Sequence, residues 1–283
     1  MKASWVGGVI VALGLVGCEP DRSRFVVELQ PDGSGSFRMA RERGAIGADD
    51  ALKPAALRAL AEIGGVTAWT DIVADRSEGG ALVVEARGWF EALGDVGLPG
   101  GHALEASALG DALEVRYRDP VPDRLAQLLL ADRGRARAAL ASGDEDFAAT
   151  CDRMRGFLRL WLAGWRFEVE LALPGPLEQV HGFHVLAPDR VALRQDVGTA
   201  LELLERDLRV VAAAREAVRA GELTPEEGLA RVEAGLVTAR PVVARCVVRR
   251  PPPGPDPAFE AAFQDAVVRW QASDWRNLLP RPR

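Results

Sequence analysis

Alternating apolar and polar residues in the first third of the chain predict β-hairpins. Phe25–Gln30 and Ser36–Arg41 are short strand-like runs, separated by the sequence Pro-Asp-Gly-Ser-Gly at residues 31–35. This linking segment favours a tight turn, because proline presets φ, aspartate hydrogen-bonds nearby backbone and glycine tolerates a positive φ. The same succession of strand, turn and strand recurs over residues 66–90 and 103–118.

Helical spacing of apolar residues appears in two parts of the chain. A helix from Asp49 to Ile63 is expected between the first two hairpins, because it has one apolar face and ends at a Gly-Gly pair. From residue 123 onward, apolar residues three and four apart predict further helices. These cover residues 123–141, 147–165, 197–211 and 224–236, and the last begins with a Thr-Pro-Glu-Glu capping box. Strands are expected at residues 167–173, 185–193 and 241–248.

Hairpins followed by helices, without a strand–helix–strand repeat, predict an α+β fold. We expect an antiparallel sheet of hairpins packed with helices, together with an inserted helical hairpin. The predicted boundaries are an α+β domain at 25–250 with the helical hairpin at 196–240, a proline-rich spacer at 251–257, and an amphipathic helix with a tail at 258–283. That last helix is expected to pack back on the body through Phe259, Phe263, Val267 and Trp270.

The first 17 residues have the layout of a secretory signal. One cation, Lys2, precedes an uncharged apolar run that is too short to cross a bilayer. The run ends in Leu15-Val16-Gly17-Cys18, which resembles the bacterial lipobox, in which the cysteine thiol is acylated and becomes the mature N-terminus. The resemblance implies a lipoprotein signal peptide at 1–17, lipid such as palmitate on Cys18, and a polar tether at 18–24. An ordinary signal peptide or a short anchor with a chance cysteine is the alternative.

Composition places the rest of the chain among ordinary globular proteins, with 48% hydrophobic and 27% charged residues. The formal net charge of −6 argues against a nucleic-acid partner, because contacts to phosphates need clustered cations. Together with the anchor, these properties predict a protein of the bacterial cell envelope, held to a membrane through lipid on Cys18. The outer membrane, facing the periplasm, is the expected location.

Two cysteines remain beyond the lipobox, Cys151 on an apolar helical stripe and Cys246 on an apolar strand face. An oxidising compartment permits a disulfide between them. Closing so long a loop would stabilise the fold by roughly 4–5 kcal/mol in the entropic model. Two separate buried thiols are the alternative, because sequence alone does not give connectivity.

Sequence motifs of the common enzyme classes are absent. No glycine-rich loop is followed by lysine, and there is no G-x-S-x-G, H-E-x-x-H, S-x-x-K or C-x-x-C pattern. His181 and His184 lie three residues apart and would hold a metal with His102 only if their segment were helical. Gly182 favours a strand or loop, on which residues three apart face opposite sides. We therefore predict no metal, cofactor or catalytic residue, and expect that the chain is not an enzyme.

Five aromatic residues are candidates for lining an apolar cavity between the sheet and the helices: Trp69, Trp89, Trp161, Trp165 and Phe183. Trp69 and Trp89 are expected to pair across the second hairpin. Such a cavity would suit a lipid or another apolar ligand. A solid core is the alternative, because large aromatic side chains usually fill space.

Two short stretches resemble the LppM-like lipoprotein domain. They are the strand Phe167–Leu173, which ends in Pro-Gly-Pro, and Arg190–Leu193 in the short hairpin that follows. The chain departs from that pattern, because the Asn-Gly turn and tryptophan common in the second hairpin are replaced by His181-Gly182 and Ala192-Leu193. The resemblance implies an envelope-facing α+β domain that binds apolar ligands and has no catalytic residues.

These observations favour a membrane-anchored envelope lipoprotein that binds an envelope protein or an apolar ligand. Two alternatives stay open. One is an unrecognised periplasmic hydrolase built around His181 or His184. The other is a structural or assembly protein of the cell envelope that docks through the helices at 196–240 or 258–279.

Overall fold

The computed structural model describes residues 21–45, 52–118, 133–141, 162–238, 244–249 and 256–279, together with Asp152, Arg155, Gly156, Arg159 and Leu160. The described residues form two compact units. Those within 120–165 and 195–241 make the helical unit, and those within 19–119, 166–194 and 242–283 make the sheet unit.

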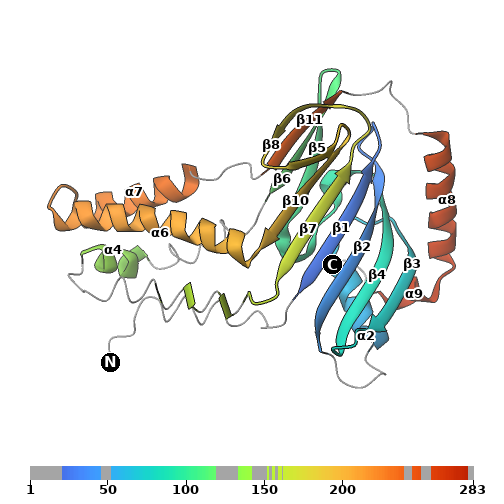
Figure 1. Ribbon diagram of the computed structural model, residues 1–283, viewed down its shortest axis with the longest axis horizontal. Coiled ribbons are helices and arrows are strands. Elements are labelled where there is room, and N and C mark those ends of the chain that lie inside the picture. Colours follow the sequence, from blue (N-terminus) through green and yellow to red (C-terminus); the bar gives the residue numbers. More distant parts are fainter. Residues whose placement is uncertain are drawn as a thin grey trace. The chain divides into compact units, whose positions relative to one another are not determined.

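Seven strands form the larger sheet, in the order β3-β4-β2-β1-β7-β10-β9 (Figure 1). Their bounds are β1 (Arg22–Leu29), β2 (Gly35–Ala45), β3 (Ala68–Arg76), β4 (Ala81–Phe90), β7 (Arg166–Ala172), β9 (His184–Ala187) and β10 (Arg190–Asp196). The pairs β1–β2, β2–β4, β3–β4 and β9–β10 are antiparallel. β1 and β7 run parallel in the middle of the sheet, a pairing that the sequence did not predict.

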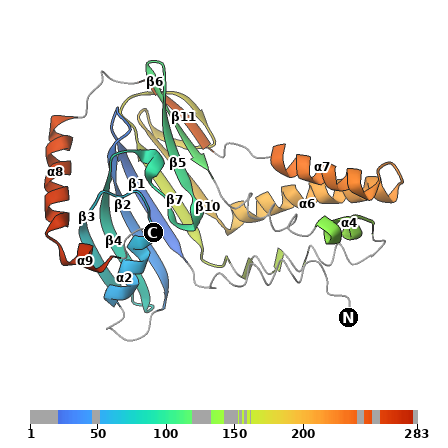
Figure 2. The ribbon, with the colours of Figure 1, turned by 180° about the vertical axis from the view of Figure 1, so that it is seen from behind.

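A second sheet of four strands and a helix cover one face of the larger sheet (Figure 2). They are β5 (Ala103–Leu109), β6 (Ala112–Arg118), β11 (Ala244–Arg249), β8 (Leu177–His181) and helix α2 (Leu52–Ala61). The rings of His102 and Tyr117 stack on Phe167 of β7, with centroids 4.1 and 6.1 Å apart. The core of the sheet unit therefore lies between the two sheets. The predicted α+β fold with hairpins and helices is confirmed.

A buried arginine fixes the point at which the chain enters the larger sheet. The Arg41 side chain is 2% exposed and forms ion pairs with Asp21 at 2.5 Å and Glu62 at 2.6 Å. Its Nη1 donates to the carbonyl of Ala59 in α2 at 3.3 Å. Burial by itself lowers the pKa of the Arg41 guanidinium, but the hydrogen bonds and charges of Asp21 and Glu62 outweigh it and raise that pKa.

The tether predicted at 18–24 is therefore too long. Residues 22–24 belong to β1, and the backbone N–H of Arg166 donates to the carbonyl of Asp21 at 3.1 Å. The strand was missed because its first residues, Arg22-Ser23-Arg24, are all polar. Ser23 faces the covered side of the sheet, where its hydroxyl donates to the Asp21 carboxylate at 2.9 Å.

A bulge in β3 separates the two tryptophans of the second hairpin. A regular register would place Trp69 opposite Trp89. The register shifts by one residue around Asp71, whose φ is 53°, so Trp69 lies opposite Gly88 and Trp89 opposite Ala68. A one-residue shift sends side chains to opposite faces of a sheet. The expected pairing of Trp69 with Trp89 is wrong for this reason.

The C-terminal helices α8 (Pro257–Gln271) and α9 (Asp274–Leu278) belong to the sheet unit, and α8 packs along β3 (Figure 1). The Trp89 ring contacts Phe259 and Phe263 of α8, with centroids 5.7 and 6.2 Å apart. The prediction that this helix packs back on the body is confirmed. The spacer predicted at 251–257 ends earlier, because Asp256 caps α8 and Pro257 is its first residue. Residues 251–255 lie outside the described part of the chain.

The helical unit contains α4 (Arg133–Ala141), α6 (Val197–Arg219) and α7 (Pro225–Thr238). The Thr224 hydroxyl caps the N–H of Glu227, and the Glu227 carboxylate accepts from the Thr224 N–H, as the capping box predicts. A shared apolar core consists of Ala136, Leu140, Val211, Ala214, Leu229, Val232 and Leu236. The helical hairpin at 196–240 thus packs with α4, whereas the helix predicted at 123–141 was assigned to the α+β domain and not to this hairpin. The reason is that the buried apolar residues of α4, Ala136 and Leu140, share one core with those of α6 and α7.

Gly88 leaves room for an aromatic ring on the covered face of the larger sheet. A Cβ at this position would lie 2.4 Å from Cζ of Phe37, so Gly88→Ala is expected to lower the free energy of unfolding by about 2 kcal/mol. Gly94→Ala is the control, because nothing lies within 4 Å of its added Cβ. Urea unfolding measures both variants, and equal effects would contradict the tight packing of Phe37 on Gly88.

Asp207 of α6 is 2% exposed, and burial raises the pKa of its carboxyl although Arg206 lies 3.2 Å away. The folded state therefore binds a proton at this group more tightly than the unfolded chain, and ionising it costs stability as the pH rises. Asp207→Asn is expected to raise Tm at pH 7. The gain should shrink toward zero as the pH falls to about 4, near the carboxyl pKa of an unfolded chain. A lower Tm at pH 7 would contradict this assignment.

Candidate functional site

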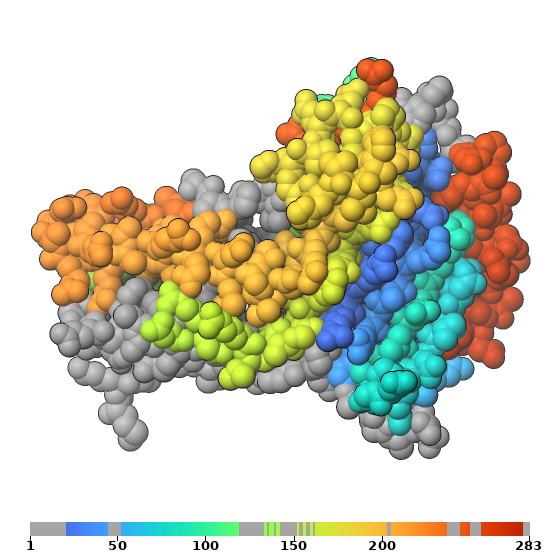
Figure 3. All heavy atoms as spheres, in the orientation of Figure 1, coloured from blue at the N-terminus to red at the C-terminus, as the bar shows by residue number. Residues whose placement is uncertain are grey.

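The outer face of the larger sheet, opposite the smaller sheet and α2, carries charged side chains at alternating strand positions. Figure 3 shows this face, with β1, β2, β4 and β7 running across it. On β1 the residues Arg22, Arg24 and Glu28 are exposed or half-buried, whereas Phe25 and Val27 are buried on the covered face. Such alternation is typical of a sheet with one solvated face.

A pocket of about 320 Å³ lies on this outer face at the end where β1 begins. Because β1 and β7 are parallel, both strands start there, and their register places Arg22 beside Arg166 and Arg24 beside Glu168. On the other side of β1, Arg24 lies opposite Ala40, whose short side chain leaves space between the longer ones. We call this the arginine pocket, and its lining is completed by Ser23, Arg41, Glu42 and Val83.

The exposed arginines of the pocket pair with glutamates that are less exposed than themselves. The side chain of Arg22 is 57% exposed and that of its partner Glu42 is 38% exposed, at 3.3 Å. The contrast is larger for Arg24, at 61%, and Glu170, at 19%. In both of these pairs the guanidinium group is therefore the more exposed partner.

Two glutamates, Glu168 in the pocket lining and Glu170 next to it, are each shared by two arginines. Glu168 contacts both Arg166 and Arg194, and Glu170 contacts Arg24 at 3.6 Å and Arg190 at 3.2 Å. This set has more guanidinium groups than carboxylates, and exposed pairs of this kind contribute little to stability. An oxyanion can compete for such arginines, since a guanidinium binds phosphate or carboxylate through two parallel hydrogen bonds. The chemistry of the pocket is thus that of anion binding.

The aromatic residues predicted to line a cavity do not come together in the sheet unit. Trp69 is 5% exposed on the covered face, where its ring meets Phe37 edge-on at 5.5 Å. Trp89 lies on the outer face and donates its Nε1–H to the hydroxyl of Thr70 at 3.1 Å. Phe183 is buried and lies in the short segment that links β8 to β9. Trp165 belongs to the helical unit, and Trp161 lies outside the described residues.

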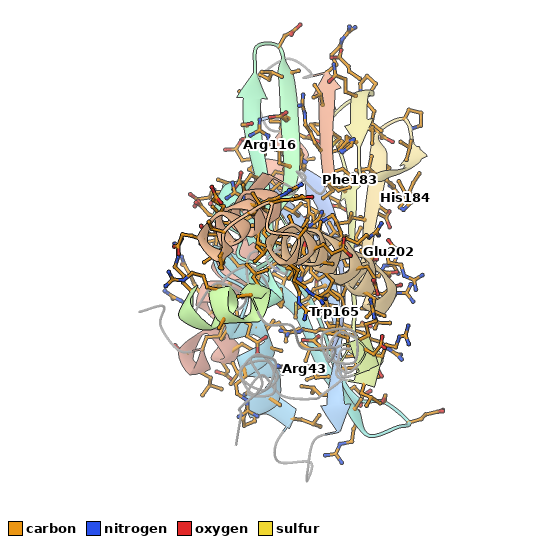
Figure 4. The ribbon with its side chains drawn as sticks, turned by 90° about the vertical axis from the view of Figure 1, so that its left-hand side faces the viewer. Arg43, Arg116, Trp165, Phe183, His184 and Glu202 are labelled. Carbon is orange, nitrogen blue, oxygen red and sulfur yellow. The ribbon has the colours of Figure 1, made fainter. Side chains whose placement is uncertain are left out.

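The histidines also lie apart. His181 ends β8 in the smaller sheet and His184 begins β9 in the larger one, and both are exposed. Figure 4 shows His184 directed away from its strand. His102 is buried, with its Nδ1 2.7 Å from the Tyr117 hydroxyl. Among the described residues, no group of three or more His, Cys, Asp or Glu side chains is placed to hold a metal. The hydrolase hypothesis gains no support from these histidines.

Cys246 is fully buried on β11 and forms no disulfide with any described residue. Burial raises its pKa to about 12, with a smaller contribution from the charge of Glu114 and an opposing hydrogen bond from Val115. Cys18 and Cys151 lie outside the described residues, so the bridge between Cys151 and Cys246 stays a prediction. No helix in the described ranges is long and apolar enough to span a membrane.

Comparison with known proteins gives one distant likeness. No family model matches the chain, and no curated protein matches it. The NMR structure of the folded domain of LppM from Mycobacterium tuberculosis is similar with a TM-score of 0.34 and 12% sequence identity. The alignment covers 62% of this chain and 82% of that domain. This is a weak resemblance to a lipoprotein domain.

Sequence reasoning missed the arginine pocket. Arg22 and Arg24 fell within the predicted tether, and Arg166 directly follows a predicted helical stripe. The alternation of charged residues at Arg166, Glu168 and Glu170 was an available signal of a solvated strand face. Only the parallel pairing of β1 with β7, far apart in the sequence, makes these side chains neighbours.

The buried thiol of Cys246 is expected to resist alkylation in the folded protein. At pH 8 a pKa of about 12 leaves about a thousandfold less thiolate than an ordinary cysteine has, and the sulfur is shielded as well. The measurement compares iodoacetamide labelling with and without urea in a variant in which Cys18 and Cys151 are serine. Equal labelling rates in the two conditions would contradict the buried position.

Proposed function

We propose that the chain is a lipid-anchored protein of the bacterial cell envelope whose folded body acts by binding at the membrane surface. The observation that carries the proposal is the lipobox-like Leu15-Val16-Gly17-Cys18 ahead of a body whose described part begins at Asp21. The expected location is the outer membrane, on its periplasmic side. Acylation with more than one chain gives durable anchoring, because a single chain binds a membrane only marginally.

The short distance between anchor and body supports a role at the membrane surface. Asp21 is held by Arg41, by the Ser23 hydroxyl and by the backbone of Arg166. Cys18 is three residues earlier, so their Cα atoms are at most about 11 Å apart. A body held this closely meets lipid headgroups and membrane-bound partners before it meets anything deeper in the periplasm.

The outer surface, rather than an internal apolar cavity, is the better candidate for binding. Trp69 and Trp89 lie on opposite faces of the larger sheet, and each packs against other aromatic rings. The apolar faces of the helices proposed for docking are also used within the chain. Residues of α6 and α7 pack with α4, and α8 packs on β3.

The anchor is tested by replacing the acylated cysteine. Cys18→Ala should abolish incorporation of a fatty-acid analogue, because the thiol is the acceptor, and should block cleavage between Gly17 and Cys18. Cys246→Ala is the matched control and should keep full labelling, since that thiol is buried. Metabolic labelling followed by mass spectrometry of the N-terminal peptide reads out both. Undiminished labelling of Cys18→Ala would refute the proposed anchor.

A further inference from the structure

We infer that the arginine pocket binds the phosphate groups of anionic lipids and thereby holds the Arg22 end of the larger sheet against the membrane. The inference rests on the proposed anchor at Cys18. It adds to that proposal a specific surface of the body and the chemical class of its ligand. The occupant is the headgroup layer of a membrane that contains anionic phospholipid.

The pocket lies at the end of the sheet that is nearest in sequence to the proposed anchor. Arg22 begins β1 and lies one residue beyond Asp21, which the ion pair with Arg41 fixes to the fold. The acylated cysteine is four residues from Arg22, so the two Cα atoms are at most about 14 Å apart. Arg166 lies directly beside Arg22 because β7 runs parallel to β1. The pocket is therefore within reach of the headgroups of the bilayer that holds the anchor.

The arginines of the pocket are more exposed than the glutamates with which they pair. Arg22, Arg24 and Arg166 are 57, 61 and 43% exposed, and each is paired with a glutamate whose side chain is less exposed than its own. Within each pair, a headgroup phosphate approaching this face therefore has better access to the guanidinium group than to the carboxylate. The glutamates hold the arginines in place through these ion pairs. Juxtamembrane arginines are attracted to the negative surface potential of anionic membranes, and the attraction fades within a Debye length.

The surface between the arginines is concave. Between the arginines the sheet is hollowed to about 320 Å³ above Ala40 and Val83, whose side chains are short. A phosphodiester group is small enough to enter a hollow of this volume, whereas a fully packed strand face would hold headgroups only at its outer tips. The hollow lets more than one guanidinium reach the same phosphate, which favours bidentate contacts.

Vesicle binding of residues 19–283, which lack the signal peptide and the acylated cysteine, tests the inference without the lipid anchor. This polypeptide retains every described residue, and circular dichroism checks its fold. We expect flotation with vesicles of phosphatidylcholine mixed with phosphatidylglycerol and none with phosphatidylcholine alone. Binding should fall steeply at about 0.5 M NaCl, because salt screens exposed charges. Absence of binding, or equal binding to both vesicles, would overturn the inference.

A pair of matched variants tests whether the pocket itself is responsible. Arg24→Gln combined with Arg166→Gln should weaken binding to the mixed vesicles by about tenfold or more. Both neighbouring glutamates keep a second arginine, so the fold should persist. Arg118→Gln combined with Arg249→Gln removes the same charge from side chains that are 71 and 73% exposed on the smaller sheet, and should reduce binding less than threefold. Equal losses would refute a specific site.

Inorganic phosphate distinguishes a lipid surface from a soluble anion as the ligand. At matched ionic strength, free phosphate is expected to leave vesicle binding almost unchanged, because the surface engages several headgroups at once. Saturable phosphate binding together with loss of vesicle binding would overturn the lipid assignment. These outcomes are independent of Cys18 labelling, so failure of the pocket and failure of the anchor can be told apart.

Discussion

The parallel pairing of β1 with β7 is the constraint on which the sheet unit depends. It joins residues 22–28 to residues 166–172 and places the start of the described chain in the middle of a seven-stranded sheet. β2 and β4 follow on one side of β1, and β10 and β9 follow on the far side of β7. The same pairing aligns the first residues of two strands and so creates the arginine pocket. Without it, Arg22 and Arg166 would belong to unrelated parts of the surface.

A buried ion-pair network around Arg41 holds the start of β1 in place. Arg41 is almost fully buried and joins Asp21, Glu62 and the carbonyl of Ala59, so that one side chain ties the start of β1 to α2. Removing one member of such a buried network is costly, since the others remain desolvated without their partner. The distance between the body and the proposed lipid on Cys18 is therefore set by a fixed point at Asp21.

Local features of the fold were readable from the sequence, and long-range ones were not. The turns at residues 31–35, 77–80 and 110–111 each connect the strands expected of them, because turn residues act locally. The capping box at Thr224 formed for the same reason. The bulge at Asp71 could not be predicted from the sequence, and neither could the faces on which Trp69 and Trp89 lie. One inserted residue exchanges the faces to which the following side chains point, without changing the composition of the strand. Partners distant in sequence, such as Arg24 and Glu170, follow only from the topology.

The orientation of the sheet unit on the membrane is the central claim and is open to direct measurement. The turn at residues 77–80 lies at the end of the sheet that holds Arg22, because Val83 pairs with Glu42 and Glu42 with Arg22. The turn containing Asp32 is at the other end of β1, about 26 Å away. Spin labels on Glu78→Cys and Asp32→Cys would be compared in the lipidated protein in bilayers containing a headgroup-chelated paramagnetic ion. We predict that the paramagnetic ion strongly enhances the relaxation of the spin label at position 78 and has little effect on the label at position 32. Equal or reversed enhancement would contradict the proposed orientation.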